Sequence, residues 1–154
     1  MSFLNAGRLN SAHKKKFHFW IWSELFVAQS DLVLAGKSCL VVDDEMLIAL
    51  DIEQILLAAG AANVICLASA EEALASLRSG SRFDVAVLDI LLRGVTRDSF
   101  SLAAALQLLK TPFVCLTGMR GADLRAGKFP DVPVVEKPYQ PALLIEAIVR
   151  SLAR

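Results

Sequence analysis

The chain has 154 residues, a length typical of one domain with a single hydrophobic core. Its apolar fraction of 55% argues against a disordered protein, and its 16 basic and 16 acidic residues cancel, so net charge does not favour a nucleic acid partner. Cys39, Cys66 and Cys115 lack the spacing of metal ligands, and we expect buried thiols in a reducing, cytoplasmic compartment.

Residues 1–36 form a predicted N-terminal extension. A basic cluster, Lys14–Lys16, precedes apolar residues near helical spacing, namely Phe17, Trp20, Ile21, Leu25 and Ala28. Glu24 and other polar residues interrupt this run, so it lacks the roughly twenty apolar residues of a membrane span. We predict an amphipathic helix that packs on the domain or a loose extension. Binding to a membrane surface or to a partner is the alternative.

Residues 37–154 form the predicted domain, in which strands and helices alternate. The predicted strands are short apolar runs at 38–44, 63–68, 83–89, 112–118 and 132–138. The predicted helices carry apolar residues at helical spacing and lie at 46–60, 69–80, 98–109 and 141–153. Glycines between the last two strands leave room only for a short helical turn at 122–126.

Local signals indicate where the helices begin and end. Ser69 and Glu72 form a predicted capping box, and Gly60 and Gly80 can each end a helix. The buried face of the first predicted helix comprises Ile48, Ile52, Ile55, Leu56 and Ala59. The buried face of the third comprises Leu102, Leu106 and Leu109.

The alternation predicts an α/β fold with a parallel sheet covered by helices on both faces. Ligands of such sheets bind beyond the carboxyl ends of the strands. The polar residues at these predicted strand ends are Asp43, Asp44, Asp89, Thr117 and Lys137. Each has an ordinary explanation by itself, such as a helix cap or a turn, but their convergence at one edge favours a functional site.

These residue types suit phosphoryl transfer. Carboxylates about 4 Å apart repel one another by about 4 kcal/mol per pair at an effective dielectric near 20. A hard cation such as Mg²⁺, which prefers oxygen ligands, would offset that repulsion. A carboxylate can accept the phosphoryl group while the metal, the Lys137 ammonium and the Thr117 hydroxyl stabilise its charge.

The motifs "VVDDE", "VLDI", "LTG" and "EKPY" together resemble those of the receiver domain of two-component response regulators, over residues 37–154. The resemblance implies a flavodoxin-like (βα)5 three-layer sandwich with sheet order 2-1-3-4-5. It also implies a cis peptide bond between Lys137 and Pro138, which proline makes accessible.

The resemblance further implies the roles of the site residues. Asp89 would be the phosphoacceptor, supplied by a histidine kinase or a histidine phosphotransfer protein. Thr117 and Lys137 would assist the transfer. Mg²⁺ would be held by Asp43, Asp44, Asp89 and the backbone carbonyl of Leu91.

Some positions depart from the family pattern. Val134 stands where receivers usually carry an aromatic switch residue, and Met119 replaces a tyrosine that follows the Thr-Gly pair in some stand-alone receivers. The acidic set is complete, whereas the usual relay from threonine to the aromatic residue is altered. We therefore expect the response to phosphorylation to appear in residues 118–130.

No DNA-binding or catalytic output pattern follows the last predicted helix. We therefore expect a single-domain response regulator that acts through phosphorylation-dependent protein–protein interaction or as a phosphate sink. We expect no enzymatic activity beyond Mg²⁺-dependent self-phosphorylation and slow self-dephosphorylation. The alternative is a receiver-fold interaction module that signals without phosphorylation. A haloacid-dehalogenase-type phosphatase fits less well, because "VVDDEM" lacks its Asp-x-Asp pattern.

Overall fold

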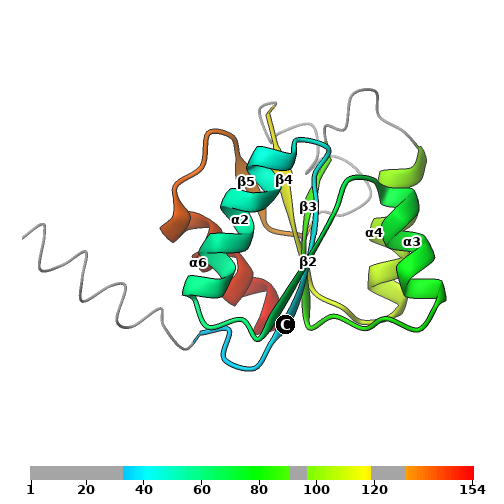
Figure 1. The fold of residues 1–154 in the computed structure, drawn as a ribbon, viewed down its shortest axis with the longest axis horizontal. Helices are drawn as coiled ribbons and strands as arrows, with labels where there is room; N and C mark the ends of the chain where they lie inside the picture. The colour runs from blue at the N-terminus through cyan, green and yellow to red at the C-terminus, as the bar shows by residue number, and fades with distance from the viewer. Residues whose placement is uncertain (1–32, 91–96, 119–130) are drawn as a thin grey trace, which may run out of the picture.

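A five-stranded parallel sheet forms the centre of the molecule, which the computed structural model describes over residues 33–90, 97–118 and 131–154 (Figure 1). The strands are β1 Ser38–Val42, β2 Asn63–Leu67, β3 Val85–Asp89, β4 Phe113–Thr117 and β5 Val134–Glu136. Their order in the sheet is β2-β1-β3-β4-β5, and every neighbouring pair is parallel. The predicted flavodoxin-like order 2-1-3-4-5 is therefore confirmed.

Helices cover both faces of this sheet. They are α2 Met46–Ala58, α3 Ala70–Arg78, α4 Arg97–Leu108 and α6 Pro141–Leu152. Helices α2 and α6 lie on one face, and α3 and α4 lie on the other (Figure 1). Each face has its own apolar cluster, because a parallel sheet buried on both sides presents apolar residues in both directions.

The central strands are the most deeply buried part of the fold. All five residues of β3 are buried, as are all five of β4. The edge strand β2 instead has only exposed and half-buried positions. This difference explains why "VAVL", residues 85–88, is a continuous apolar run although it ends next to a carboxylate.

Most helix-end signals act as predicted. Gly60 and Gly80 adopt left-handed φ values of 94° and 101° behind α2 and α3. The Ser69 hydroxyl accepts a hydrogen bond from the Glu72 backbone N–H at 3.2 Å. The reciprocal bond of the predicted capping box differs, because the Glu72 carboxylate accepts from the Ala68 N–H, one residue earlier than expected.

The buried face of α2 is confirmed. Ile52, Leu56 and the following Ala59 are buried, while Ile48 and Ile55 pack half-buried against the same cluster. On α4, Leu102 and Leu106 are buried.

The prediction for Leu109 was wrong, because that side chain is 40% exposed. Helix α4 ends at Leu108, and Lys110 turns the chain with a left-handed φ of 55°. Leu109 therefore does not continue the helical face on which Leu102 and Leu106 lie.

Strand β5 is shorter than its apolar run suggested. It spans three residues, with Pro133 just before it. Proline has no N–H to give to a strand ladder, which limits pairing at this end. The peptide bond between Lys137 and Pro138 is cis, as the resemblance implied.

Several predictions fall on residues outside the described ranges. These are the amphipathic helix at 17–28, the backbone carbonyl of Leu91, the turn at 122–126 and the response within 119–130. At the start of the described chain, Leu34 is fully buried and its N–H donates to the Ala59 carbonyl at 2.9 Å. Among the described helices, none has the length and apolar character needed to cross a membrane.

Candidate functional site

Two buried carboxylates meet at the carboxyl edge of the sheet. Asp43 directly follows β1, and Asp89 is the last residue of β3. These strands are neighbours, with Val42 paired to Leu88. Asp43 is 2% exposed and Asp89 is 4% exposed. The parallel register thus brings together two charged groups that lie 46 residues apart in the chain, as the sequence predicted.

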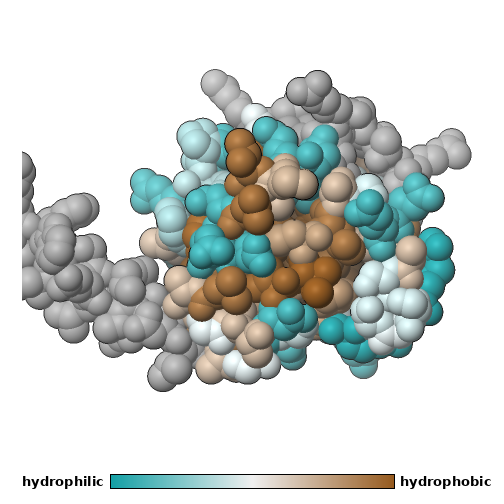
Figure 2. Space-filling view, viewed as in Figure 1, coloured by the Kyte–Doolittle hydropathy of each residue, from teal (hydrophilic) through white to brown (hydrophobic). Residues whose placement is uncertain are grey.

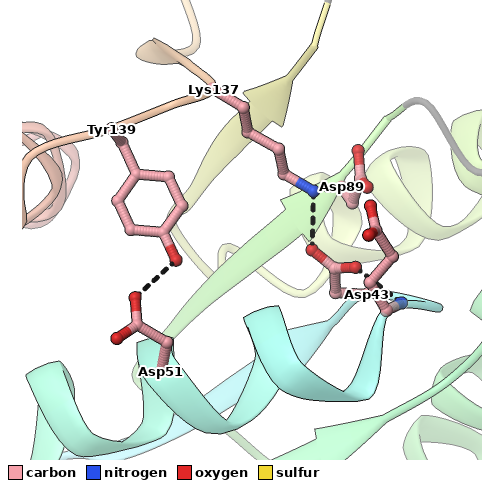
Figure 3. A network of polar contacts seen from close by, with 6 residues as sticks. Asp43, Asp51, Asp89, Lys137 and Tyr139 are labelled. Carbon is pink, nitrogen blue, oxygen red and sulfur yellow. Dashed lines mark hydrogen bonds and ion pairs between the residues drawn. The ribbon is translucent and has the colours of Figure 1, made fainter.

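Lys137 connects the two carboxylates. It follows β5, and its Nζ lies 2.9 Å from Asp43 Oδ2 and 2.8 Å from Asp89 Oδ2 (Figure 3). The lysine side chain is only 15% exposed, so water screens these contacts weakly. Charge-assisted hydrogen bonds at this separation are among the stronger ones in proteins. The buried charge of Asp89 is therefore paired.

The electrostatic balance of the site remains negative. Burial raises the pKa of Asp43 above its ordinary value, and hydrogen bonds from Lys137 and from the Glu45 backbone offset this only in part. Burial alone would lower the pKa of Lys137, but hydrogen bonds to Asp89 and Asp43 raise it overall. One ammonium is shared between two carboxylates, so an additional cation would be favourable here.

Glu45 joins the two aspartates in a potential metal site. Carboxylate oxygens of Asp43, Glu45 and Asp89 lie within 4.8 Å of one another. The Glu45 backbone N–H donates to Asp43 Oδ1 at 2.8 Å, which fixes the turn that leads into α2. Oxygen donors of this kind fit a hard divalent cation such as Mg²⁺.

The composition of this group differs from the predicted ligand set. Asp44 is exposed and lies outside the group, and Leu91 lies outside the described residues. Their roles as ligands stay predictions. From the sequence alone, Glu45 has the ordinary explanation of a favourable charge at the start of a helix. The acidic triplet in "VVDDE" was the available signal, but the direction of each side chain depends on the turn after β1.

Thr117 lies at the same edge, as the last residue of β4, and is 1% exposed. Strand β4 pairs with β3 on one side and β5 on the other. The Lys137 backbone N–H donates to the Thr117 carbonyl at 2.7 Å. The four residues Asp43, Asp89, Thr117 and Lys137, predicted from strand ends, thus come from four different strand ends to one edge of the sheet.

No protein-family model matches this sequence, and no curated protein matches it. Solved structures do match. A response regulator receiver protein from Sinorhizobium medicae WSM419 is 30% identical with a TM-score of 0.68, over 77% of this chain and 95% of that chain. The chemotaxis response regulator CheY4 of Vibrio cholerae is 27% identical with a TM-score of 0.64, over 77% and 100% of the two chains.

A more distant structure shares the fold. The response regulator PhyR from Brucella abortus is 20% identical with a TM-score of 0.66, over 82% of this chain and 51% of that chain. All three similarities cover more than three quarters of the present chain.

Proposed function

Because this chain belongs to the response regulator receiver family, we propose that it accepts a phosphoryl group on Asp89 from a histidine kinase or a histidine phosphotransfer protein. The observation that carries this proposal is the contact of Lys137 Nζ with Asp43 and Asp89 at 2.9 and 2.8 Å. It combines a candidate nucleophile, a cation and a second carboxylate at the sheet edge where α/β proteins bind ligands.

The residues support a simple division of roles. An oxygen of Asp89 attacks phosphorus while the bond from phosphorus to the donor's imidazole nitrogen breaks, so the phosphoryl group moves to the carboxylate. The charge on Asp89 then changes from about −1 toward −2. Lys137 already contacts Asp89 and can follow the new oxygens, while Thr117 supplies a hydroxyl from the neighbouring strand.

The acidic residues fit a resident Mg²⁺. Asp43 and Asp89 would hold it, with Glu45 or Asp44 as a further oxygen donor. When bound, Mg²⁺ neutralises negative charge on the phosphoryl oxygens. Without the metal, the same carboxylates repel one another, and binding of a divalent ion would relieve that repulsion.

An exposed apolar surface beside the site supports a protein phosphodonor. Met46 and Leu47 begin α2 immediately after Glu45 and are 74% and 83% exposed. Leu50 and Leu57 extend this surface along the same helix. Figure 2 shows apolar residues gathered over α2 and the β2 edge. Apolar side chains grouped in this way indicate a contact surface for another protein.

We further propose that the output is phosphorylation-dependent protein–protein contact or the removal of phosphate from a relay, with no enzymatic activity other than self-phosphorylation and slow self-dephosphorylation. The alternative is a receiver-fold module that binds its partner without phosphorylation. The phosphorylated regulator and the phosphorylation-independent module share the same fold. Whether Asp89 accepts a phosphoryl group therefore distinguishes them.

The test is intact-mass analysis after incubation with acetyl phosphate and Mg²⁺. Wild type should gain one phosphoryl group, and Asp89→Asn should gain none, because the amide keeps the shape but is not a nucleophile. Asp84→Asn is the matched control, since Asp84 lies just before β3 and forms an exposed ion pair with Lys37. Phosphorylation of Asp89→Asn at the wild-type rate would refute the assignment. Wild type that stays unmodified with every phosphodonor would favour the alternative module.

A further inference from the structure

Tyr139 forms a polar contact that the proposed chemistry does not use. It lies in the loop between β5 and α6, two residues after Lys137. Its hydroxyl donates to Asp51 Oδ2 on α2 at 3.1 Å (Figure 3). The ring is half-buried and packs against the apolar cluster between the sheet and helices α2 and α6. The contact therefore joins the loop that carries the lysine to the helix that follows Asp43.

The hydroxyl keeps its proton under ordinary conditions. Burial raises the pKa of Tyr139 well above its usual value, and the hydrogen bond to Asp51 raises it further. Tyr139 therefore remains a hydrogen-bond donor at neutral pH. Asp51 is exposed, so water can hydrogen-bond its carboxylate when Tyr139 does not. The Asp51 carboxylate therefore does not require this hydrogen bond.

The loop between β5 and α6 is held on two sides. At one end, the Lys137 backbone N–H donates to the Thr117 carbonyl of β4 at 2.7 Å. At the other end, Tyr139 is tied to α2. Helix α2 starts three residues after Asp43, whose carboxylate is one of the two contacts of Lys137 Nζ. The hydrogen bond to α2 therefore connects the loop to the helix that begins three residues after one of the two carboxylates.

We propose that Tyr139 is a positioning residue, whose hydrogen bond to Asp51 keeps Lys137 directed at the phosphoacceptor site. The inference deepens the proposed function and rests on it for its kinetic consequence. The Lys137 side chain is flexible, with four rotatable bonds. Its ammonium can therefore be placed accurately only if the Lys137 backbone is itself held in place. Loss of the tie lets the loop move away from α2, and modest misplacement of a charged group is enough to slow a transfer reaction.

The structural part of the test does not depend on phosphorylation. Tyr139→Phe removes only the hydroxyl and keeps the packed ring. Amide hydrogen exchange of the Lys137 N–H, measured by NMR, should become about fivefold faster, since an ordinary hydrogen bond changes an opening equilibrium by roughly that factor. Asp51→Ala should have the same effect. Asp51→Asn keeps an oxygen acceptor and should lie closer to wild type, and Glu53→Gln on the same helix is the matched control.

The kinetic part asks whether Tyr139 acts through Lys137. The rate of phosphorylation by acetyl phosphate at saturating Mg²⁺ should fall about fivefold in Tyr139→Phe. In a Lys137→Met background the same change should have no further effect, because the group that it positions is gone. A general loss of folding would lower the rate equally in both backgrounds.

The outcomes separate this inference from the proposed function. Unmodified wild type would refute the phosphoacceptor, whereas the exchange of the Lys137 amide would still decide whether Tyr139 positions the loop. Unchanged exchange in Tyr139→Phe overturns the inference. So does a rate loss that persists in the Lys137→Met background, and so does equal loss in Asp51→Asn and Asp51→Ala.

Discussion

Replacing Lys137 by methionine tests the electrostatic reading of the site most directly. Methionine keeps much of the apolar stem but removes the ammonium that contacts Asp43 and Asp89. Both carboxylates are then left almost completely buried without their shared cation. We expect the Mg²⁺-free protein to lose considerable stability, and we expect added Mg²⁺ to restore much of it.

The magnitude follows from the geometry. Removing one partner from a buried ion pair typically costs about 3–5 kcal/mol, because the remaining charge is desolvated and uncompensated. Repulsion between the two aspartates adds to this penalty, although protonation of Asp43, whose pKa burial already raises, relieves part of it. In a domain of this size, the loss corresponds to a fall in Tm of roughly 6–20 °C.

Urea and thermal unfolding, with and without Mg²⁺, measure the effect. Lys37→Met is the matched control, because Lys37 forms an exposed pair with Asp84 at 3.6 Å with side chains 39% and 43% exposed. Exposed pairs contribute about 0–1 kcal/mol. Mg²⁺ should stabilise Lys137→Met more than wild type, since the cation compensates for the missing charge.

Two results would refute this reasoning. The first is a loss in Lys137→Met no larger than that in Lys37→Met, which would mean that the contacts with Asp43 and Asp89 are worth no more than an exposed pair. The second is a gap between variant and wild type that Mg²⁺ leaves unchanged. The gap should also narrow as pH falls, because protonation of Asp43, whose pKa burial raises, removes part of the uncompensated charge.

Two further predictions concern the metal and the thiols. Isothermal titration with Mg²⁺ should show a larger loss of affinity, by about tenfold, in Glu45→Ala than in Asp44→Ala, since Glu45 belongs to the carboxylate group and Asp44 does not. The reverse order would indicate that Asp44 is the ligand. Burial raises the pKa of Cys39 to about 11 and that of Cys115 to about 12, from 9.0, so their contribution to stability is complete below pH 9 and is lost as pH rises toward 12. For Cys39 alone, the free energy of unfolding should fall by about 3 kcal/mol as pH rises. A free energy of unfolding in urea that is the same at pH 8.5 and at pH 11 would contradict this prediction.

Much of the site was predictable from the sequence, because the relevant pattern is local. Each strand is a short apolar run, and the polar residue that ends it can be read directly, as for Asp89 and Lys137. The alternation of strands and helices implies a parallel sheet, in which all carboxyl ends meet at one edge. The convergence of Asp43, Asp89, Thr117 and Lys137 therefore followed from the order of elements alone.

Other features depend on where a chain turns and which way a side chain points. Glu45 belongs to the carboxylate group and Asp44 does not, and the turn before α2, in which the Glu45 N–H donates to Asp43 Oδ1, cannot be derived from the sequence pattern. Leu109 lost its predicted burial because α4 ends one residue earlier and the chain turns at Lys110. Helical periodicity cannot locate such an end to a single residue.

The contact between Tyr139 and Asp51 belongs wholly to the tertiary structure. The two residues are 88 positions apart, and neither stands at a strand end where the fold class would place a functional group. Asp51 is an exposed residue of α2, and the sequence alone does not distinguish it from an ordinary solvated charge. A hydrogen bond between them requires α2 and the β5–α6 loop to be positioned relative to each other to within about an ångström. Sequence periodicity determines which face of an element is buried, whereas only the packed structure determines which side chains of two distant elements meet at the border of those faces.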